Sequence, residues 1–170
     1  GDIKGLISRL GYIQGLGADV LYLNPIALAN TNHKYDTLDY RAVSPEYGTR
    51  DDARALARDV HARGMKIMLD GVFNHMGRNS PAFRQAEADP KSKYRDWFVF
   101  GPQYAGGARA WALAENLPEL NLENPAVRDD LWNARDSVVR GWLRDGMDGW
   151  RLDVAFDIGF KYLGELTQAA

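Results

Sequence analysis

Stretches in which apolar residues recur at helical spacing alternate along the chain with short, continuous apolar runs. Residues 3–16 and 50–63 carry apolar side chains three or four positions apart, which predicts two amphipathic helices. Thr49 is placed to cap the second of these helices, and Gly64 follows its last turn. The continuous runs, which predict buried strands, span residues 19–26, 65–73 and 147–155.

The segments between these elements are predicted from their loss of periodicity. Residues 30–48 are polar and predict a loop. Residues 76–123 are rich in proline, glycine and aromatic residues, which indicates a loop-rich insert with no helix of more than about 20 residues. The Asn-Pro pair at 124–125 opens a helix that we expect to end at Gly146. A last helix is expected over residues 159–170.

The alternation of helices and buried strands predicts an α/β fold with a parallel sheet and helical crossovers. Three strands are too few for a closed eight-stranded barrel, which needs about 250 residues. The chain of 170 residues therefore corresponds either to part of a (β/α)8 TIM barrel or to a small open α/β sheet. Its expected divisions are a barrel segment over 1–75, an inserted subdomain over 76–123 and a second barrel segment over 124–170.

Charge and composition exclude several classes of partner. The 21 basic and 23 acidic residues give a net charge of -2 without a basic stripe, so nucleic acid is not an expected partner. No apolar run reaches 18 residues, so no membrane span is expected. The absence of cysteine excludes disulfides and thiolate chemistry. Aromatic residues in loop-like contexts, including Tyr35 and Trp111, are candidates for stacking on sugar rings, although most should be packing residues.

Two strand ends carry the candidate chemistry. In Gly149-Trp150-Arg151-Leu152-Asp153, the arginine and the aspartate are two positions apart and share one face of a strand. A cation there favours an ionised carboxylate, as a carboxylate nucleophile needs, but a structural ion pair fits the spacing equally well. Asp70, Asn74 and His75 close the strand at 65–73. Parallel barrels present their chemistry at that end of their strands, which favours a catalytic interpretation.

Several motifs resemble those of the α-amylase family of glycoside hydrolases. They are Asp70-Gly71-Val72-Phe73-Asn74-His75, Leu117-Pro118-Glu119-Leu120-Asn121 and Gly149-Trp150-Arg151-Leu152-Asp153. Two further segments, 32–37 and 92–98, are most similar to the cyclomaltodextrinase, neopullulanase and maltogenic amylase group. The resemblance implies that the chain holds about strands 2 to 4 of the TIM barrel, with a loop-rich insert after the third.

The resemblance also implies a retaining mechanism on the α-glucosidic bonds of starch-derived oligosaccharides. Asp153 would be the catalytic nucleophile, and Arg151 would orient it and keep it ionised. Asp70 and His75 would lie near the bound sugar, and Tyr35 would stack under it. The implied partner is an α-glucan oligosaccharide. No cofactor is required, although calcium could have a structural role in a longer parent protein; Asn74 and the segment Gly1-Asp2 match its ligands in different branches of the family.

The family's acid/base glutamate has no match here. Asp157, Glu119 and Glu165 do not fit its motif, and Glu165 is expected on a solvated helix face. The isolated chain is therefore expected to be inactive. The alternatives are a carbohydrate-binding or scaffold protein with an amylase-like fold, against which the presence of Arg151 and Asp153 argues, and a short protein that completes its barrel as a homo-oligomer. A bacterial cytoplasm or periplasm is the expected location.

Overall fold

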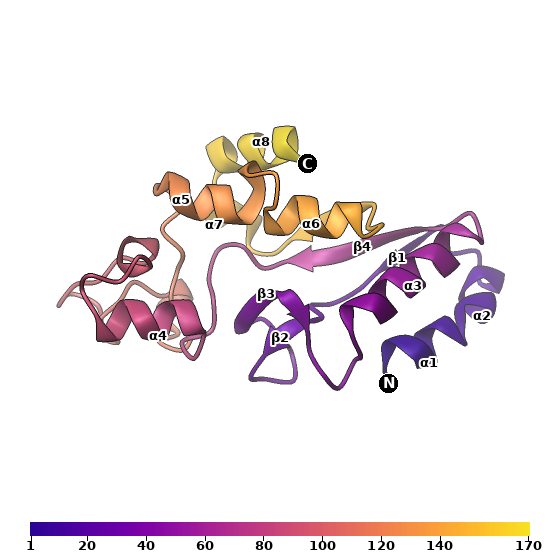
Figure 1. Cartoon of the computed structure of the whole chain (residues 1–170), viewed down its shortest axis with the longest axis horizontal. Helices are drawn as coiled ribbons and strands as arrows, with labels where there is room; N and C mark the ends of the chain where they lie inside the picture. Colours follow the sequence, from indigo (N-terminus) through magenta and orange to yellow (C-terminus); the bar gives the residue numbers. More distant parts are fainter.

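The structure is a computed structural model that describes all 170 residues, and it is built around a three-stranded parallel sheet (Figure 1). The strand order is β1-β4-β5, with β4 in the centre. The strands span Val20–Tyr22 (β1), Lys66–Gly71 (β4) and Gly149–Leu152 (β5). They confirm the mixed α/β class, and each lies inside an apolar run that predicts a strand.

The strand β1 is less buried than its apolar sequence predicts. Val20 is 48% and Tyr22 41% exposed, whereas Ile67 of β4 is fully buried. The reason is the position of each strand, because β4 has a neighbour on both sides and β1 pairs with β4 alone. The prediction of a buried strand over 19–26 was therefore wrong in its burial and too long.

The prediction of an irregular loop over residues 30–48 was also wrong. Strand β2 (Ala27–Ala29) pairs antiparallel with strand β3 (Thr37–Val43). In β3 the buried residues are Thr37, Tyr40 and Val43, three positions apart, and the residues between them are partly or fully exposed. The register of the β2–β3 pairing is also irregular. That irregular burial hides the two-residue period by which a strand is recognised.

Helix α3 (Arg50–His61) confirms the predicted amphipathic helix and its cap. Thr49 accepts a hydrogen bond from the backbone N–H of Asp52, and the Asp52 carboxylate accepts one from the backbone N–H of Thr49 at 2.8 Å. This reciprocal capping box satisfies two N–H groups that the helix itself leaves free. The apolar face of α3 is buried and contacts β4 through residues such as Leu56 and Val60.

Three predicted helices are interrupted. The first divides into α1 (Ile3–Ile7) and α2 (Leu10–Gly15), because Arg9 leaves the helical conformation. The last divides into α7 (Ala155–Ile158) and α8 (Phe160–Ala169), because Gly159 has a φ of +80°.

The helix expected over 124–146 is broken in its middle. It consists of α5 (Pro125–Arg128), a π-turn over Asp129–Asn133, and α6 (Val138–Arg144). Ser137 adopts an extended conformation and caps α6 through its side chain, while its hydroxyl donates to the backbone carbonyl of Trp132. A serine that bonds to its local backbone competes with continuation of the helix, which explains the break.

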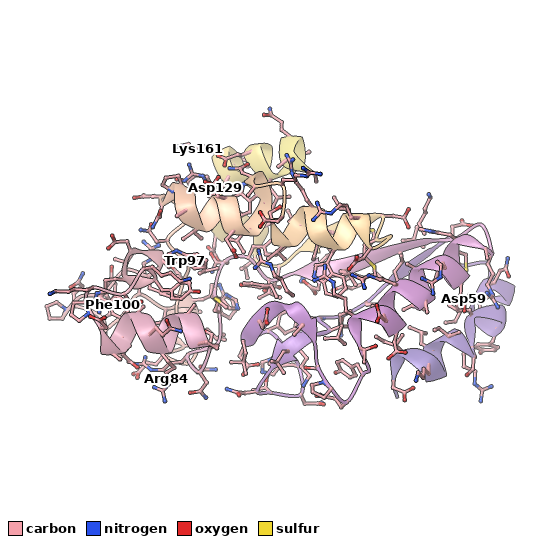
Figure 2. The ribbon with its side chains drawn as sticks, viewed as in Figure 1. Asp59, Arg84, Trp97, Phe100, Asp129 and Lys161 are labelled. Atoms are coloured by element: carbon pink, nitrogen blue, oxygen red, sulfur yellow. The ribbon has the colours of Figure 1, made fainter.

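Residues 76–123 contain one α-helix, α4 (Pro81–Ala88), and two short 3-10 turns at Arg95–Trp97 and Trp111–Leu113. Figure 2 shows Trp97, Phe100 and Arg84 gathered around α4, at the opposite end of the molecule from Asp59 on α3. Phe83, Phe98 and Phe100 form an aromatic cluster, with ring centroids 4.9 Å apart for the first pair. Isolated bridges, such as the one between His75 and Glu119, join this segment to the end of β4.

Candidate active site

The register between β4 and β5 brings the two candidate strand ends together. Asp70 lies opposite Arg151 in the parallel pairing. The guanidinium Nη1 of Arg151 donates to both carboxylate oxygens of Asp70 at 3.1 Å and to Oδ1 of Asp153 at 2.7 Å. Asp153 and Arg151 therefore share one face, as their spacing predicts, and one guanidinium bridges two carboxylates.

Asp70 is the centre of this cluster. Its side chain is fully buried, and it also accepts hydrogen bonds from the hydroxyls of Tyr22 and Tyr35, the latter at 3.2 Å. Burial and then the bond to Asp70 raise the pKa of Tyr22, and burial and the charge of Asp70 raise the pKa of Tyr35. The hydrogen bonds to Asp70 and Asp153 raise the pKa of Arg151. Both tyrosines stay neutral donors, and the arginine stays a cation.

Tyr22 is a site residue that the sequence analysis did not identify. It is the last residue of β1, so the rule that parallel strands present polar groups at their carboxyl ends applies to it as well. Its position within a continuous apolar run hid it, because a tyrosine there resembles a packing residue.

The residues before and after Tyr35 in the sequence are both buried and fix its position. Lys34 has a φ of +65°, is 3% exposed, and pairs through its ammonium with Glu46. Asp36 is 4% exposed and accepts from the backbone N–H of Thr31 at 3.2 Å and from its hydroxyl. Two buried charged neighbours with partners therefore fix the short segment that presents the Tyr35 hydroxyl to Asp70.

His75 is 1% exposed, and its Nε2 makes no hydrogen bond within the chain. The amide nitrogen of Asn74 lies 3.4 Å from Nδ1. The indole of Trp111 stacks on the imidazole, with ring centroids 5.6 Å apart and an interplanar angle of 28°. Burial lowers the pKa of His75, and the negative charge of Asp153 opposes that shift, which places the two side chains in one electrostatic environment.

The other nearby carboxylates have partners of their own. Asp157 accepts a hydrogen bond from Nε1 of Trp111 at 3.0 Å, and Glu119 lies 2.6 Å from Nε of Arg109. A cleft of 340 Å³ lies beside the strand ends, and its lining includes Asn74, Arg109, Glu119 and Asp157. These polar groups make the cleft suitable for a hydroxyl-rich ligand.

Glu165 is not on a solvated helix face, so that prediction was wrong. Its carboxylate accepts from Nε of Arg128 at 3.0 Å, from Nε1 of Trp132 at 3.2 Å, and from the amide of Asn133. Burial opposes ionisation, but these three donors together lower the pKa of Glu165. It ties α8 to α5 and the π-turn, which is a structural role.

The two segments that match calcium ligands in relatives have contacts within the chain. Asp2 caps α1 by accepting from the backbone N–H of Gly5 at 2.7 Å, and Asn74 contacts His75. No group of three or more histidine, aspartate or glutamate side chains that could hold a metal ion is present. Calcium in a longer parent protein stays a prediction.

Polar and charged side chains at the carboxyl ends of three adjacent parallel strands, beside a desolvated histidine, are typical of an α/β-barrel enzyme. The chain belongs to the alpha-amylase family. The family model described as "Alpha amylase, catalytic domain" matches residues 1–165. The fold is accordingly that of the α-amylase catalytic domain, a member of the TIM-barrel class.

Individual relatives agree with this assignment. The chain is 40% identical over 175 residues to Neopullulanase 2 of Thermoactinomyces vulgaris and 38% identical over 173 residues to the intracellular maltogenic amylase of Bacillus subtilis. Each match covers 99% of this chain but only 29% of the relative. The ligand-free cyclic alpha-maltosyl-(1-->6)-maltose hydrolase of Arthrobacter globiformis superposes with a TM-score of 0.89 at 37% identity, covering 99% of this chain and 39% of that one. None of the helices combines the length and apolar character needed to span a bilayer.

Proposed function

We propose that this chain supplies the nucleophile side of an active site that hydrolyses α-glucosidic bonds in starch-derived oligosaccharides with retention. Asp153 is the nucleophile. Its carboxylate attacks the anomeric carbon, the bond to the leaving oxygen breaks, and a covalent glycosyl ester forms that water later hydrolyses. The observation that carries the proposal is the guanidinium of Arg151 bridging Asp153 and the buried Asp70.

Arg151 performs two tasks in this proposal. Its guanidinium donates to the carboxylate of Asp153, the group that would attack carbon. Its bonds to Asp70, whose side chain is buried and also held by two tyrosines, fix the guanidinium and therefore the direction of the nucleophile. Asp70 acts through Arg151 and is a positioning residue.

His75 and Tyr35 would bind the sugar. Nε2 of His75 is buried and makes no hydrogen bond within the chain. In the tautomer whose Nδ1 accepts from the amide of Asn74, 3.4 Å away, Nε2 carries the proton and is suited to donate to a sugar hydroxyl. The ring of Tyr35, whose hydroxyl bonds to Asp70, offers an apolar face for the underside of the pyranose.

Strands β1, β4 and β5 would be strands 2 to 4 of the barrel, with residues 76–123 as the inserted subdomain after the third. Retaining hydrolysis needs a second carboxyl about 5–5.5 Å from the nucleophile. Of the nearby candidates, Asp70 and Asp157 accept hydrogen bonds within the chain, and Glu119 forms an ion pair with Arg109. We propose that the acid/base residue belongs to a longer parent protein, since the chain spans 29% of its curated relatives.

The proposed partner is an α-glucan oligosaccharide, in line with relatives named as maltogenic amylase, neopullulanase and cyclomaltodextrinase. No cofactor is needed for this chemistry, because both half-reactions use carboxyl groups and water. A structural calcium ion, if the parent protein binds one, would need ligands beyond Asp2 and Asn74, since calcium takes 6–8 oxygen ligands.

A glycosyl fluoride tests the nucleophile directly in the 170-residue chain. Fluoride leaves without protonation, so the missing acid is not needed for the first step. We expect 5-fluoro-α-glucosyl fluoride to add one fluorohexosyl unit to Asp153, as seen by intact mass and peptide mapping. Asp130→Asn, at a carboxylate that pairs with Arg41, is the matched control and should still be labelled. Labelling of Asp153→Asn at the same rate, or no labelling of the unchanged chain, would contradict the assignment.

Turnover provides the second test. The chain alone should not hydrolyse maltotriose, pullulan or a cyclodextrin at ordinary enzyme rates of about 1–10³ per second, because loss of acid catalysis alone removes about 10²–10⁴-fold. In a parent protein with the acid/base residue, Asp153→Asn should abolish hydrolysis and leave sugar binding largely intact.

A further inference from the structure

The inserted segment reaches the candidate site through one side chain. Trp111 lies in a short 3-10 turn of that segment, and its ring stacks on the imidazole of His75 at the end of β4. Its indole N–H donates to the carboxylate of Asp157 at 3.0 Å, on helix α7. One half-buried tryptophan thus contacts the candidate sugar-binding histidine and the helix that directly follows Asp153.

The backbone around Trp111 is built to hold this orientation. Ala112 and Leu113 both adopt left-handed conformations, with φ of 49° and 63°, and neither is a glycine. Leu113 is 93% exposed, so the strain does not serve to bury its side chain. The N–H of Trp111 donates to the carbonyl of Leu117 at 3.0 Å, and its carbonyl accepts from Ala114 at 2.8 Å. Left-handed residues other than glycine cost energy and are typical of functional sites. Here the strained turn sets the direction of the Trp111 side chain.

The segment that receives the indole is strained as well. Val154, the residue after Asp153, has a φ of 42°, which is unfavourable for a β-branched side chain. Helix α7 starts at the next residue and is only four residues long. The hydrogen bond from Trp111 to Asp157 is therefore a tertiary contact on a helix that its own backbone bonds support weakly.

We propose that Trp111 is a positioning residue for His75 and for the segment after Asp153: its ring shields one face of the imidazole, and its indole N–H holds α7 in place. The role of His75 as a sugar-binding residue rests on the proposed function, but the contacts through which Trp111 positions it do not. Without the indole, one face of the imidazole opens to water, and α7 loses its side-chain hydrogen bond to the inserted segment.

His75 is enclosed by the chain, and the indole is part of that enclosure. His75 is 1% exposed, and Glu119 lies opposite it in the bridge to the inserted segment. The stacked indole lies 5.6 Å from the imidazole, centroid to centroid. Removal of the indole should therefore expose His75 to reagents in solution.

The chain contains three histidines, so the rate at which diethyl pyrocarbonate modifies each imidazole at fixed pH, followed by peptide mass spectrometry, tests the proposal without any substrate. His75 is 1% exposed and should react slowly, whereas in Trp111→Ala it should react at a rate approaching that of the exposed His33. Trp111→Phe, which keeps an aromatic face, should leave the reaction of His75 slow. Trp97→Ala, another half-buried tryptophan in the inserted segment, is the matched control and should change nothing at His75.

Trp111→Phe also reports on the hydrogen bond, and it keeps the test decisive if Trp111→Ala does not fold. It should accelerate amide exchange in α7 by about fivefold, the effect expected for one lost hydrogen bond. An unchanged modification rate of His75 in Trp111→Ala, an equal increase in Trp97→Ala, or unchanged exchange in Trp111→Phe would overturn the proposal. These measurements use no sugar, whereas the labelling of Asp153 in the unchanged chain does not involve Trp111 variants, so the proposal and the proposed function fail separately.

Discussion

At the scale of single residues, Asp70 connects more of the candidate site than any other side chain. It joins β1, the segment that carries Tyr35, and β5 through hydrogen bonds to Tyr22, Tyr35 and Arg151. A fully buried carboxylate is tolerated because several donors compensate for its lost hydration. Its position in the centre of the sheet makes it the residue on which the geometry of the others depends.

Asp70→Ala should destabilise the fold and disorder the site. Removal of one partner from a buried ion pair costs about 3–5 kcal/mol, but Arg151 is 45% exposed, so we expect about 1–3 kcal/mol after solvent screening. Urea unfolding measures the loss. Asp130→Ala, which breaks the exposed pair with Arg41, is the control and should cost less than about 1 kcal/mol. Equal losses in the two variants would show that Asp70 has no special role.

His75 should make stability depend on pH in mildly acidic solution. Burial lowers its pKa in the folded state below the ordinary value of 6.5, so the unfolded chain binds the proton first as the pH falls. The free energy of unfolding should therefore fall as the pH drops below about 6.5 and level off once the folded state is also protonated. Urea midpoints between pH 7.5 and 5 measure this. His75→Gln should flatten the profile in that window, and a profile identical to that of the unchanged chain would exclude His75 as the cause.

At the scale of elements, α3 shows how local sequence and tertiary packing cooperate. Its capping box arises from residues three positions apart, and its buried face packs on the central strand. The cap fixes where the helix begins, and that start determines which side chains face β4. Helix α6, by contrast, begins at Val138, after its cap Ser137, because the chain has left the helical conformation at Ala134.

Thr49→Ala should remove the side-chain half of the capping box at the start of α3. We expect a loss of about 1 kcal/mol, within the usual range of about 0.5–2 for such caps. Thermal or urea unfolding followed by circular dichroism measures it. Thr167→Ala is the matched control, because that hydroxyl donates to the carbonyl of Leu163 near the end of α8 and caps nothing. A comparable loss in both variants would contradict a capping role.

At the scale of the whole molecule, the sheet has two edges without a partner strand, one on β1 and one on β5. Val20 and Tyr22 on β1 are large, apolar or aromatic, and about half exposed. Strand edges of this kind favour pairing with another strand, from the same protein or from a second copy. The homo-oligomer therefore remains a prediction with a defined surface.

Val20→Lys should weaken self-association of the 170-residue chain if the β1 edge mediates it, because charged side chains disfavour edge-to-edge pairing. Sedimentation velocity at several concentrations measures this. Tyr12→Lys is the matched control, since Tyr12 is 68% exposed and lies on helix α2, not on a strand. A monomeric unchanged chain, or equal weakening by both substitutions, would rule out the β1 edge.

The residue pattern by itself determined the elements and pairings that depend on local spacing. Helix α3 follows from a period of 3.6, the strands β4 and β5 from continuous apolar runs, and the shared face of Arg151 and Asp153 from a period of 2. The family motifs predict catalytic roles at the ends of β4 and β5, and these roles stay a prediction. These features are local because they depend on residues that are near neighbours along the chain.

Only the tertiary structure decided the features that join distant residues. The hydrogen-bonded cluster around Asp70 includes Tyr22, which is 48 positions away in the sequence. The ring that stacks on His75 belongs to Trp111, in a segment without hydrophobic periodicity. The hairpin of β2 and β3 and the breaks beside Gly159 and Ser137 were likewise decided by packing and local hydrogen bonds. A side chain in an apolar run or a loop gives no local signal of its distant partner, because the contact exists only once the sheet register and the fold of the insert bring the two together.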